Sequence, residues 1–206
     1  MDAVSIDREQ WTSFFLELQK ESDRAAAILV AAYVDSLIGA KLKELFNEGN
    51  SKTRRKLFED ANGPFSSFSA KVDAAYCLGW LEPDVFHDIG VIRRIRNKFA
   101  HQIHGLSFDT PEVLEFVNSF RVPHQLFYDW GQVKLGALKG KQSGIVLFKG
   151  EPESDVENVS DLPPEFVFRW AASWVLGILA KNLGLKFHDS DGEPLHCRLT
   201  IDPEEE

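Results

Sequence analysis

The sequence predicts an all-α fold, a helical bundle with an irregular insert that carries at most a short β-hairpin or strand pair. Apolar residues recur at helical spacing over most of the chain. The stretch without that spacing, residues 121–163, has glycines every few positions and one strand-like run, GIVLFKG. We therefore expect one domain over residues 1–206, with its core at about 7–120 and 164–184, the insert between them, and an acidic tail at about 186–206.

Start and stop signals place the helices of the core. Asp7 and Ser22 suit the caps of the first two helices, and Pro83 and Gly105 suit the first turn and the end of the central one. The predicted helices are residues 7–20, about 23–47, about 66–81, about 84–103, a short helix after Pro111, and 164–184.

The two most apolar helices, near residues 25–40 and 166–183, are expected to lie in the core. Asp35 interrupts the first run, and Arg169 and Lys181 flank the second. Both runs are short of the about 20 apolar residues that a comfortable membrane span needs. No contact with a membrane is predicted.

Composition narrows the classes of function. The chain has 206 residues, of which 44% are hydrophobic and 27% charged, as in an ordinary soluble globular protein. Its net charge of -9 and its acidic end, DPEEE, argue against broad adhesion to a phosphate backbone and against direct sequence-specific DNA binding. Cys77 and Cys197 have no metal-ligand spacing, and no secretory signal is present, so we expect a cytoplasmic protein without a metal or cofactor.

A basic cluster follows the second helix. Lys52, Arg54, Arg55 and Lys56 fall within NEGNSKTRRKLFED, residues 47–60. Such a run is compatible with a nucleic-acid patch, but a solvated loop and short helix explain it better.

The central helix combines core packing with reactive side chains. An apolar stripe is predicted along it at Val85, Ile89, Ile92, Phe99 and Ile103. Arg96 falls in that stripe, four residues after Ile92 and three before Phe99, where close packing would favour leucine. A guanidinium in an apolar seam must be paired or face a cleft. Arg96 is therefore a candidate functional residue.

Arg96, Asn97 and His101 form the candidate catalytic group. At about 100° per residue, Asn97, Ala100 and His101 fall within roughly 140° to one side of Arg96, so the group can address one small volume. An arginine that stays charged, beside an imidazole that titrates near neutrality, can bind or cleave a phosphate ester. The alternative reading of this spacing is a capped and salt-bridged helix surface.

Asp35 is predicted to form an ion pair with Arg93 or Arg96. It lies seven residues from both Ile28 and Leu42, on an apolar stripe of the second helix. A buried carboxylate and a buried guanidinium in one domain are expected to pair, since an unpaired buried charge is costly. The alternative is a partly exposed aspartate at the edge of the helix.

Three segments in sequence order resemble the mannitol operon repressor family: ESDRAAAILVAAYVDSLIGAKL, LFEDANGPFSSFSAKVDAAYCLGWLEPDVFHDI and RRIRNKFAH. The resemblance covers about residues 10–120, and the helix at 164–184 resembles the last helix of the family. It implies a regulatory protein. Residues 121–163 match nothing in that family, and the sequence has no helix-turn-helix signature, zinc site or strong basic face. Repression would therefore act through a protein partner.

RNKFAH, residues 96–101, also resembles the signature of the HEPN superfamily of all-helical, usually dimeric domains. Many members of that superfamily are metal-independent ribonucleases in toxin, CRISPR-associated and antiphage systems. The resemblance implies that Arg96 contacts the scissile phosphate, that His101 is the general base or acid, and that Asn97 orients both. It also implies a homodimer in which two such motifs meet across the interface.

Three interpretations result. The first is a dimeric regulatory protein that acts through a protein partner, which the acidic charge and the lack of a DNA-reading element favour. The second is a HEPN-type ribonuclease with RNA as its substrate, which the intact Arg-Asn-then-His pattern favours. In the third, the motif is structural, with Arg96 held by Asp35 and His101 capping the helix end.

Overall fold

The computed structural model confirms the all-α prediction. It describes residues 5–46, 51–102, 105–129, 133–137, 145–149 and 158–188. Helices form the core, and the described strands are short. In chain order the helices are α1 (Arg8–Leu18), α2 (Asp23–Glu44), α3 (Ser51–Phe58), α4 (Phe68–Cys77), α5 (Pro83–His101), α6 (Pro111–Val117), α7 (Val122–Asp129), the 3-10 turn η1 (Val159–Asp161) and α8 (Pro164–Asn182).

Local signals explain where several helices begin. Ser22 caps α2 by accepting a hydrogen bond from the Ala25 N–H at 3.3 Å, and Ser67 caps α4 by accepting one from Ala70 at 3.2 Å. Proline opens α5, α6 and α8. At that position its missing N–H removes no helical hydrogen bond.

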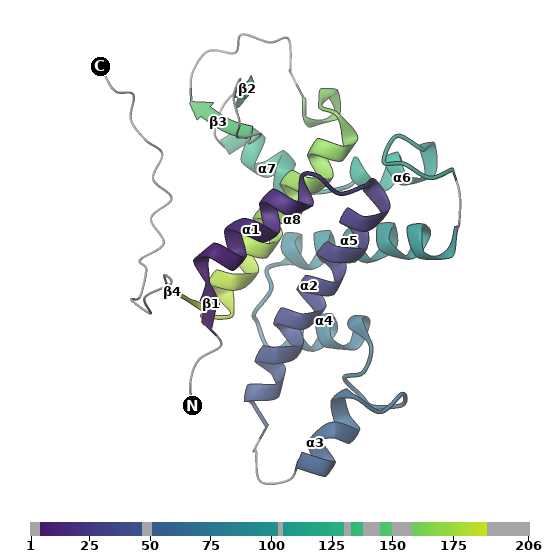
Figure 1. Ribbon diagram of the computed structural model, residues 1–206, viewed down its shortest axis with the longest axis vertical. Helices are drawn as coiled ribbons and strands as arrows, with labels where there is room; N and C mark the ends of the chain where they lie inside the picture. The colour runs from purple at the N-terminus through teal and green to yellow at the C-terminus, as the bar shows by residue number, and fades with distance from the viewer. Residues whose placement is uncertain are drawn as a thin grey trace.

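Helix α2 lies at the centre of the bundle. It packs against α4, α5 and α8, and Figure 1 shows it running across α5. By length and composition α2 is apolar enough to cross a membrane, yet half of its most apolar window is buried inside the protein, as expected of a core helix. Its buried residues are Ala26, Ala27, Val30, Ala31, Val34, Leu37, Ile38, Gly39 and Leu42.

The insert differs from its prediction at its start. Residues 121–163 begin with a helix, α7, which packs against α8. The strand predicted from GIVLFKG is confirmed as β3 (Ile145–Lys149), which pairs antiparallel with β2 (Val133–Ala137). A second, parallel pair joins β1 (Ser5–Asp7) to β4 (Lys186–His188). In its described residues the insert therefore combines the packed helix α7, the antiparallel pair β2–β3 and the 3-10 turn η1.

The apolar stripe of α5 is confirmed, except at Arg96. The buried residues of the helix include four of the predicted positions, Val85, Ile89, Ile92 and Phe99. Ile95 has an exposed fraction of 0% and takes the place predicted for Arg96, which is half-buried beside it. Spacings of three and four residues after Ile92 both continue a helical stripe. The packing of α5 against α2 and α8 selects the shorter one. Ile103 lies outside the described residues.

The predicted ion pair between Asp35 and an α5 arginine, Arg93 or Arg96, is wrong. Both carboxylate oxygens of Asp35 lie 2.9 Å from Lys71 Nζ on α4. The Arg93 guanidinium donates a hydrogen bond to the Ser69 hydroxyl instead. The physical reason is that α4 packs directly against α2, so a lysine of α4 reaches Asp35. The Asp35 side chain is 31% exposed, in keeping with the alternative reading of an aspartate at the helix edge.

Lys71→Met is expected to lower the free energy of unfolding by about 1–2 kcal/mol, because it leaves a partly exposed carboxylate without its partner. Arg96→Met is the matched control, since Arg96 forms no ion pair with any described residue, and we expect a change below about 0.5 kcal/mol. Urea unfolding of both variants provides the measurement. A larger loss for Arg96→Met than for Lys71→Met would overturn this assignment of the Asp35 partner.

A buried charge on α8 joins that helix to α1. Arg169 is 8% exposed. Its guanidinium donates to the carbonyls of Leu18 at 3.1 Å, Glu21 at 2.8 Å and Glu165 at 3.1 Å. The Leu18 carbonyl ends α1, where a helix has no internal donor for it, and the Glu21 carbonyl lies in the turn between α1 and α2. Arg169 therefore caps α1, with an Asp23 oxygen 3.9 Å away as counter-charge.

Asp88 of α5 is a fully buried polar residue that the sequence pattern did not reveal. Its two carboxylate oxygens accept hydrogen bonds from the N–H groups of Arg121 and Val122, both at 2.8 Å. His87 Nδ1 lies 3.0 Å from one of these oxygens. Burial raises the pKa of Asp88, and the hydrogen bonds from these donors act against that rise. Because the two N–H groups stand at the start of α7, the carboxylate fixes α7 to the core.

Asp88→Asn is expected to cost about 1–3 kcal/mol of unfolding free energy. An amide offers one acceptor oxygen to two N–H donors, so one buried donor is left unpaired. Urea unfolding at pH 7 measures the loss.

Asp84→Asn is the control for this change. It removes a partly exposed carboxylate that lies 3.2 Å from Arg121, and the expected loss is below about 0.5 kcal/mol. Equal losses in the two variants would show that the backbone contacts of Asp88 do not stabilise α7.

Candidate functional site

A groove lies beside the C-terminal half of α5, between that helix and α6. Its volume is about 530 Å³, and its lining consists of Arg94, Asn97, Lys98, His101, Gln102 and Phe116. The four lining residues from α5 are spaced by three, one and three positions along the chain. This spacing places them on one stripe of the helix surface. We refer to this surface as the His101 groove.

Two contacts hold α6 across the groove. The Arg94 guanidinium lies over the Phe116 ring, 5.4 Å from its centroid, in a cation–π arrangement. Lys98 Nζ lies 2.6 Å from Glu112 Oε2, and this hydrogen bond lowers the pKa of Glu112. The second pair is solvent-exposed and adds little stability, but it neutralises Lys98. Among the described residues, Arg94 is therefore the groove cation without an ion-pair partner.

The structure brings together two of the three predicted catalytic residues. Asn97 and His101 are exposed and line the groove, whereas Arg96 is half-buried and is absent from the lining. Arg96 lies two positions after Arg94, so its side chain projects from the helix about 200° further around the axis, away from the groove face. Within one chain, Arg94 supplies the guanidinium on the face of Asn97 and His101.

Sequence reasoning missed four residues of this groove: Arg94, Lys98, Gln102 and Phe116. A signal for the first two was present, because they precede His101 by seven and three positions and share its helical face. Phe116 had no such signal. Its place follows from the packing of α6 on α5, which joins segments that the helical period does not connect.

Arg24 of α2 fixes the end of α5 that carries His101. Its guanidinium donates to the carbonyl of Phe99 and, at 2.6 Å, to that of Gln102. These carbonyls stand at a helix C-terminus, where internal donors are missing. His101 forms no hydrogen bond with a described residue. The predicted cap by His101 is therefore replaced by Arg24, and the imidazole remains on the groove surface.

The groove combines three kinds of side chain that can act on a ligand. An imidazole can accept or donate a proton, a guanidinium can bind an anionic group, and the Phe116 ring offers an apolar face. This set suits acid–base chemistry on a phosphate ester or the recognition of a protein surface. Within the described ranges, no three His, Cys, Asp or Glu side chains gather in a group that could hold a metal ion.

Comparison with known proteins finds a similar fold. No family model matches the chain, and no curated protein matches it. A chain in the X-ray structure of the MtlR-HPr complex from Escherichia coli superposes with a TM-score of 0.53 at 15% sequence identity, over 84% of this chain and 98% of that chain. At this level of identity, the likeness concerns the fold.

Proposed function

We propose that this chain is a cytoplasmic regulatory protein that acts by binding another protein, and that HPr, or a protein with a similar surface, is its partner. The observation that carries the proposal is the fold likeness to a chain of the MtlR-HPr complex, which spans 84% of this chain. The segments that resemble the mannitol operon repressor family support the same function. In this proposal a homodimer affects transcription through its partner rather than by reading DNA bases.

The His101 groove is the proposed contact surface. Arginine and aromatic side chains are enriched among the residues that dominate binding energy at protein interfaces. In the groove, Arg94 and Phe116 are in contact with each other, and Asn97 and Gln102 beside them offer hydrogen-bonding groups. This arrangement, an aromatic anchor next to a cation with polar groups around it, supports binding to a partner that carries acidic and apolar side chains.

Arg94→Ala is expected to weaken binding of purified HPr at least about tenfold, because truncating an arginine that is a hot spot of an interface costs about 2 kcal/mol or more. Isothermal titration calorimetry with the full chain measures the dissociation constant.

Arg121→Ala serves as the control, since it removes an exposed arginine that does not line the groove. We expect its dissociation constant to stay within about twofold of the wild type. Failure of the wild-type chain to bind HPr would contradict the proposed partner, and equal losses in both variants would contradict the proposed surface.

A ribonuclease of the HEPN type is the second candidate, and one observation favours it: Asn97, His101 and Arg94 lie together in the groove. In this mechanism His101 would accept the proton of a ribose 2′-hydroxyl, whose oxygen attacks the adjacent phosphorus. The P–O5′ bond breaks, a 2′,3′-cyclic phosphate forms, and the 5′-oxygen takes a proton from water to leave as a hydroxyl. A guanidinium would stabilise the charge that develops on phosphate oxygens. Arg96 would reach this reaction from the partner of a homodimer.

Under the ribonuclease hypothesis, wild-type protein is expected to cleave RNA in the presence of a metal chelator, and His101→Ala is expected to lower the rate at least about a hundredfold. Gel analysis of the products measures cleavage. Sedimentation of the same samples measures the oligomeric state.

Gln102→Ala, an adjacent groove residue without acid–base chemistry, is the control and should retain most of the rate. Cleavage that persists in His101→Ala would point to a contaminating nuclease. A monomer at high micromolar concentration would contradict a site shared between two copies.

A further inference from the structure

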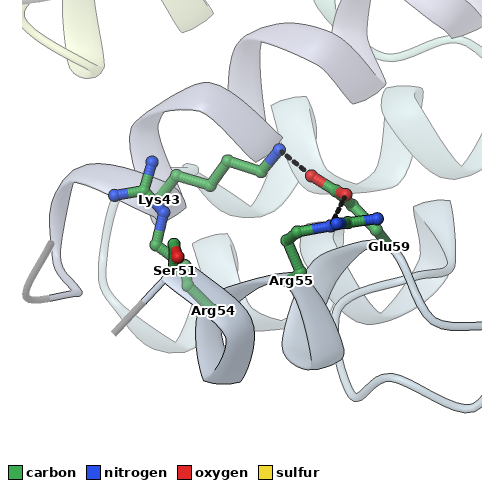
Figure 2. A pocket seen from close by; sticks show the side chains of 5 residues that line it. All are labelled: Lys43, Ser51, Arg54, Arg55 and Glu59. Atoms are coloured by element: carbon green, nitrogen blue, oxygen red, sulfur yellow. Dashed lines mark hydrogen bonds and ion pairs between the residues drawn. The ribbon is translucent and has the colours of Figure 1, made fainter. Parts of the chain in front are cut away.

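A second hollow, separate from the His101 groove, lies between the C-terminal end of α2 and helix α3. Its volume is about 320 Å³, and its lining consists of Lys43, Ser51, Arg54, Arg55 and Glu59 (Figure 2). We refer to it as the Arg54 pocket. Figure 1 places α3 at the end of the molecule opposite α7 and the β2–β3 hairpin. No step of the proposed function uses this pocket.

Cationic side chains dominate the Arg54 pocket. Three cations and one carboxylate line it, which leaves an excess of two positive charges. The carboxylate of Glu59 lies between two of the cations, with Oε1 3.7 Å from Lys43 Nζ and Oε2 3.0 Å from Arg55 Nε. Arg54 is half-buried and forms no ion pair with a described residue. In a chain with a net charge of -9, an arginine in a concave site whose one lining carboxylate pairs with other cations is suited to an incoming anion.

We propose that the Arg54 pocket binds the phosphate group of a small phosphate ester. The guanidinium of Arg54 can donate two parallel hydrogen bonds to phosphate oxygens. The Ser51 hydroxyl can donate a third, and the Lys43 ammonium adds a point charge. Glu59 competes with the anion for Lys43 and Arg55. A bound phosphate would therefore replace the Glu59 carboxylate as the partner of these two cations, which Figure 2 shows paired with Glu59.

The size and surroundings of the pocket favour a small ester over a nucleic acid. Its volume of about 320 Å³ falls at the lower end of the range for small-molecule sites, about 300–1,000 Å³. Binding along a nucleic acid requires contacts to several successive phosphates. Lys52 and Lys56, the other basic residues of α3, are exposed and do not line the pocket, and the acidic chain repels a polyanion elsewhere.

The test measures binding of inorganic phosphate and of glucose 6-phosphate to the full chain by isothermal titration calorimetry at low ionic strength, with glucose as the uncharged comparison. Both phosphates are expected to bind saturably, and glucose is not. Arg54→Gln should weaken phosphate binding at least about tenfold, because it removes a charge-assisted pair of hydrogen bonds. Lys56→Gln, on the same helix but outside the pocket, should change the affinity by about twofold or less.

Glu59→Gln distinguishes a binding site from a structural cluster, because it removes the competing carboxylate and should strengthen phosphate binding several-fold. Circular dichroism of each variant checks that it is folded.

Absence of phosphate binding by the wild type, or equal losses in Arg54→Gln and Lys56→Gln, would overturn the proposal. So would binding of a ten-nucleotide RNA alone, weakened equally by Lys52→Gln and Arg54→Gln, which would identify a nucleic-acid face. None of these measurements involves HPr, so their failure leaves the proposed function untouched.

Discussion

Two arginines that cap helix ends connect α1 to α8 and α5 to α2, and the placement of the candidate site rests on these contacts. Arg169 closes the end of α1, and Arg24 closes the end of α5. Each donates to a carbonyl that a helix end leaves without an internal donor and to a second carbonyl just beyond it, and the planar fork of a guanidinium suits two such oxygens. Asp23 adds a connection by accepting the N–H of Phe108 at 2.9 Å. All of these contacts lie near the start of α2. This region therefore fixes both the end of α5 that carries His101 and the way α1 packs against α8.

The helical faces could be predicted from the sequence because hydrophobic periodicity is a local property. Ile89 and Phe99 are buried, as their spacing predicts. The choice between Ile95 and Arg96 is not local, because positions three and four residues after Ile92 both continue the stripe. The directions from which α2 and α8 approach α5 decide which side chain is enclosed. A charged residue such as Arg96, at a position where the stripe can continue in two ways, therefore indicates the edge of the buried face. Its position alone does not indicate a function.

The polar partners could not be predicted, since they join helices that are far apart in the sequence. Asp35 is 36 residues from Lys71, and Asp88 is 33 residues from the N–H group of Arg121. A charge on an apolar stripe shows that a partner is needed, but only the packed helices show which one. The same distinction holds for the candidate site. The groove residues of α5 share one helical face, which the sequence can show, whereas Phe116 comes from α6, which only the packing shows.

Each hollow has one arginine that forms no ion pair with a described residue, Arg94 or Arg54, and the surroundings of the two arginines differ. This difference separates their proposed ligands. Arg94 lies on the Phe116 ring at an exposed surface, where an ionic contact is screened by salt within about 8 Å and apolar area must supply much of the affinity. A protein surface can provide that area. Arg54 lines a concave site together with Lys43 and a hydroxyl, and a compact dianion that enters such a site can gain from more than one donor. The two proposed ligands would use different cations, Arg94 on α5 and Arg54 with Lys43 beside α3, so neither would compete with the other.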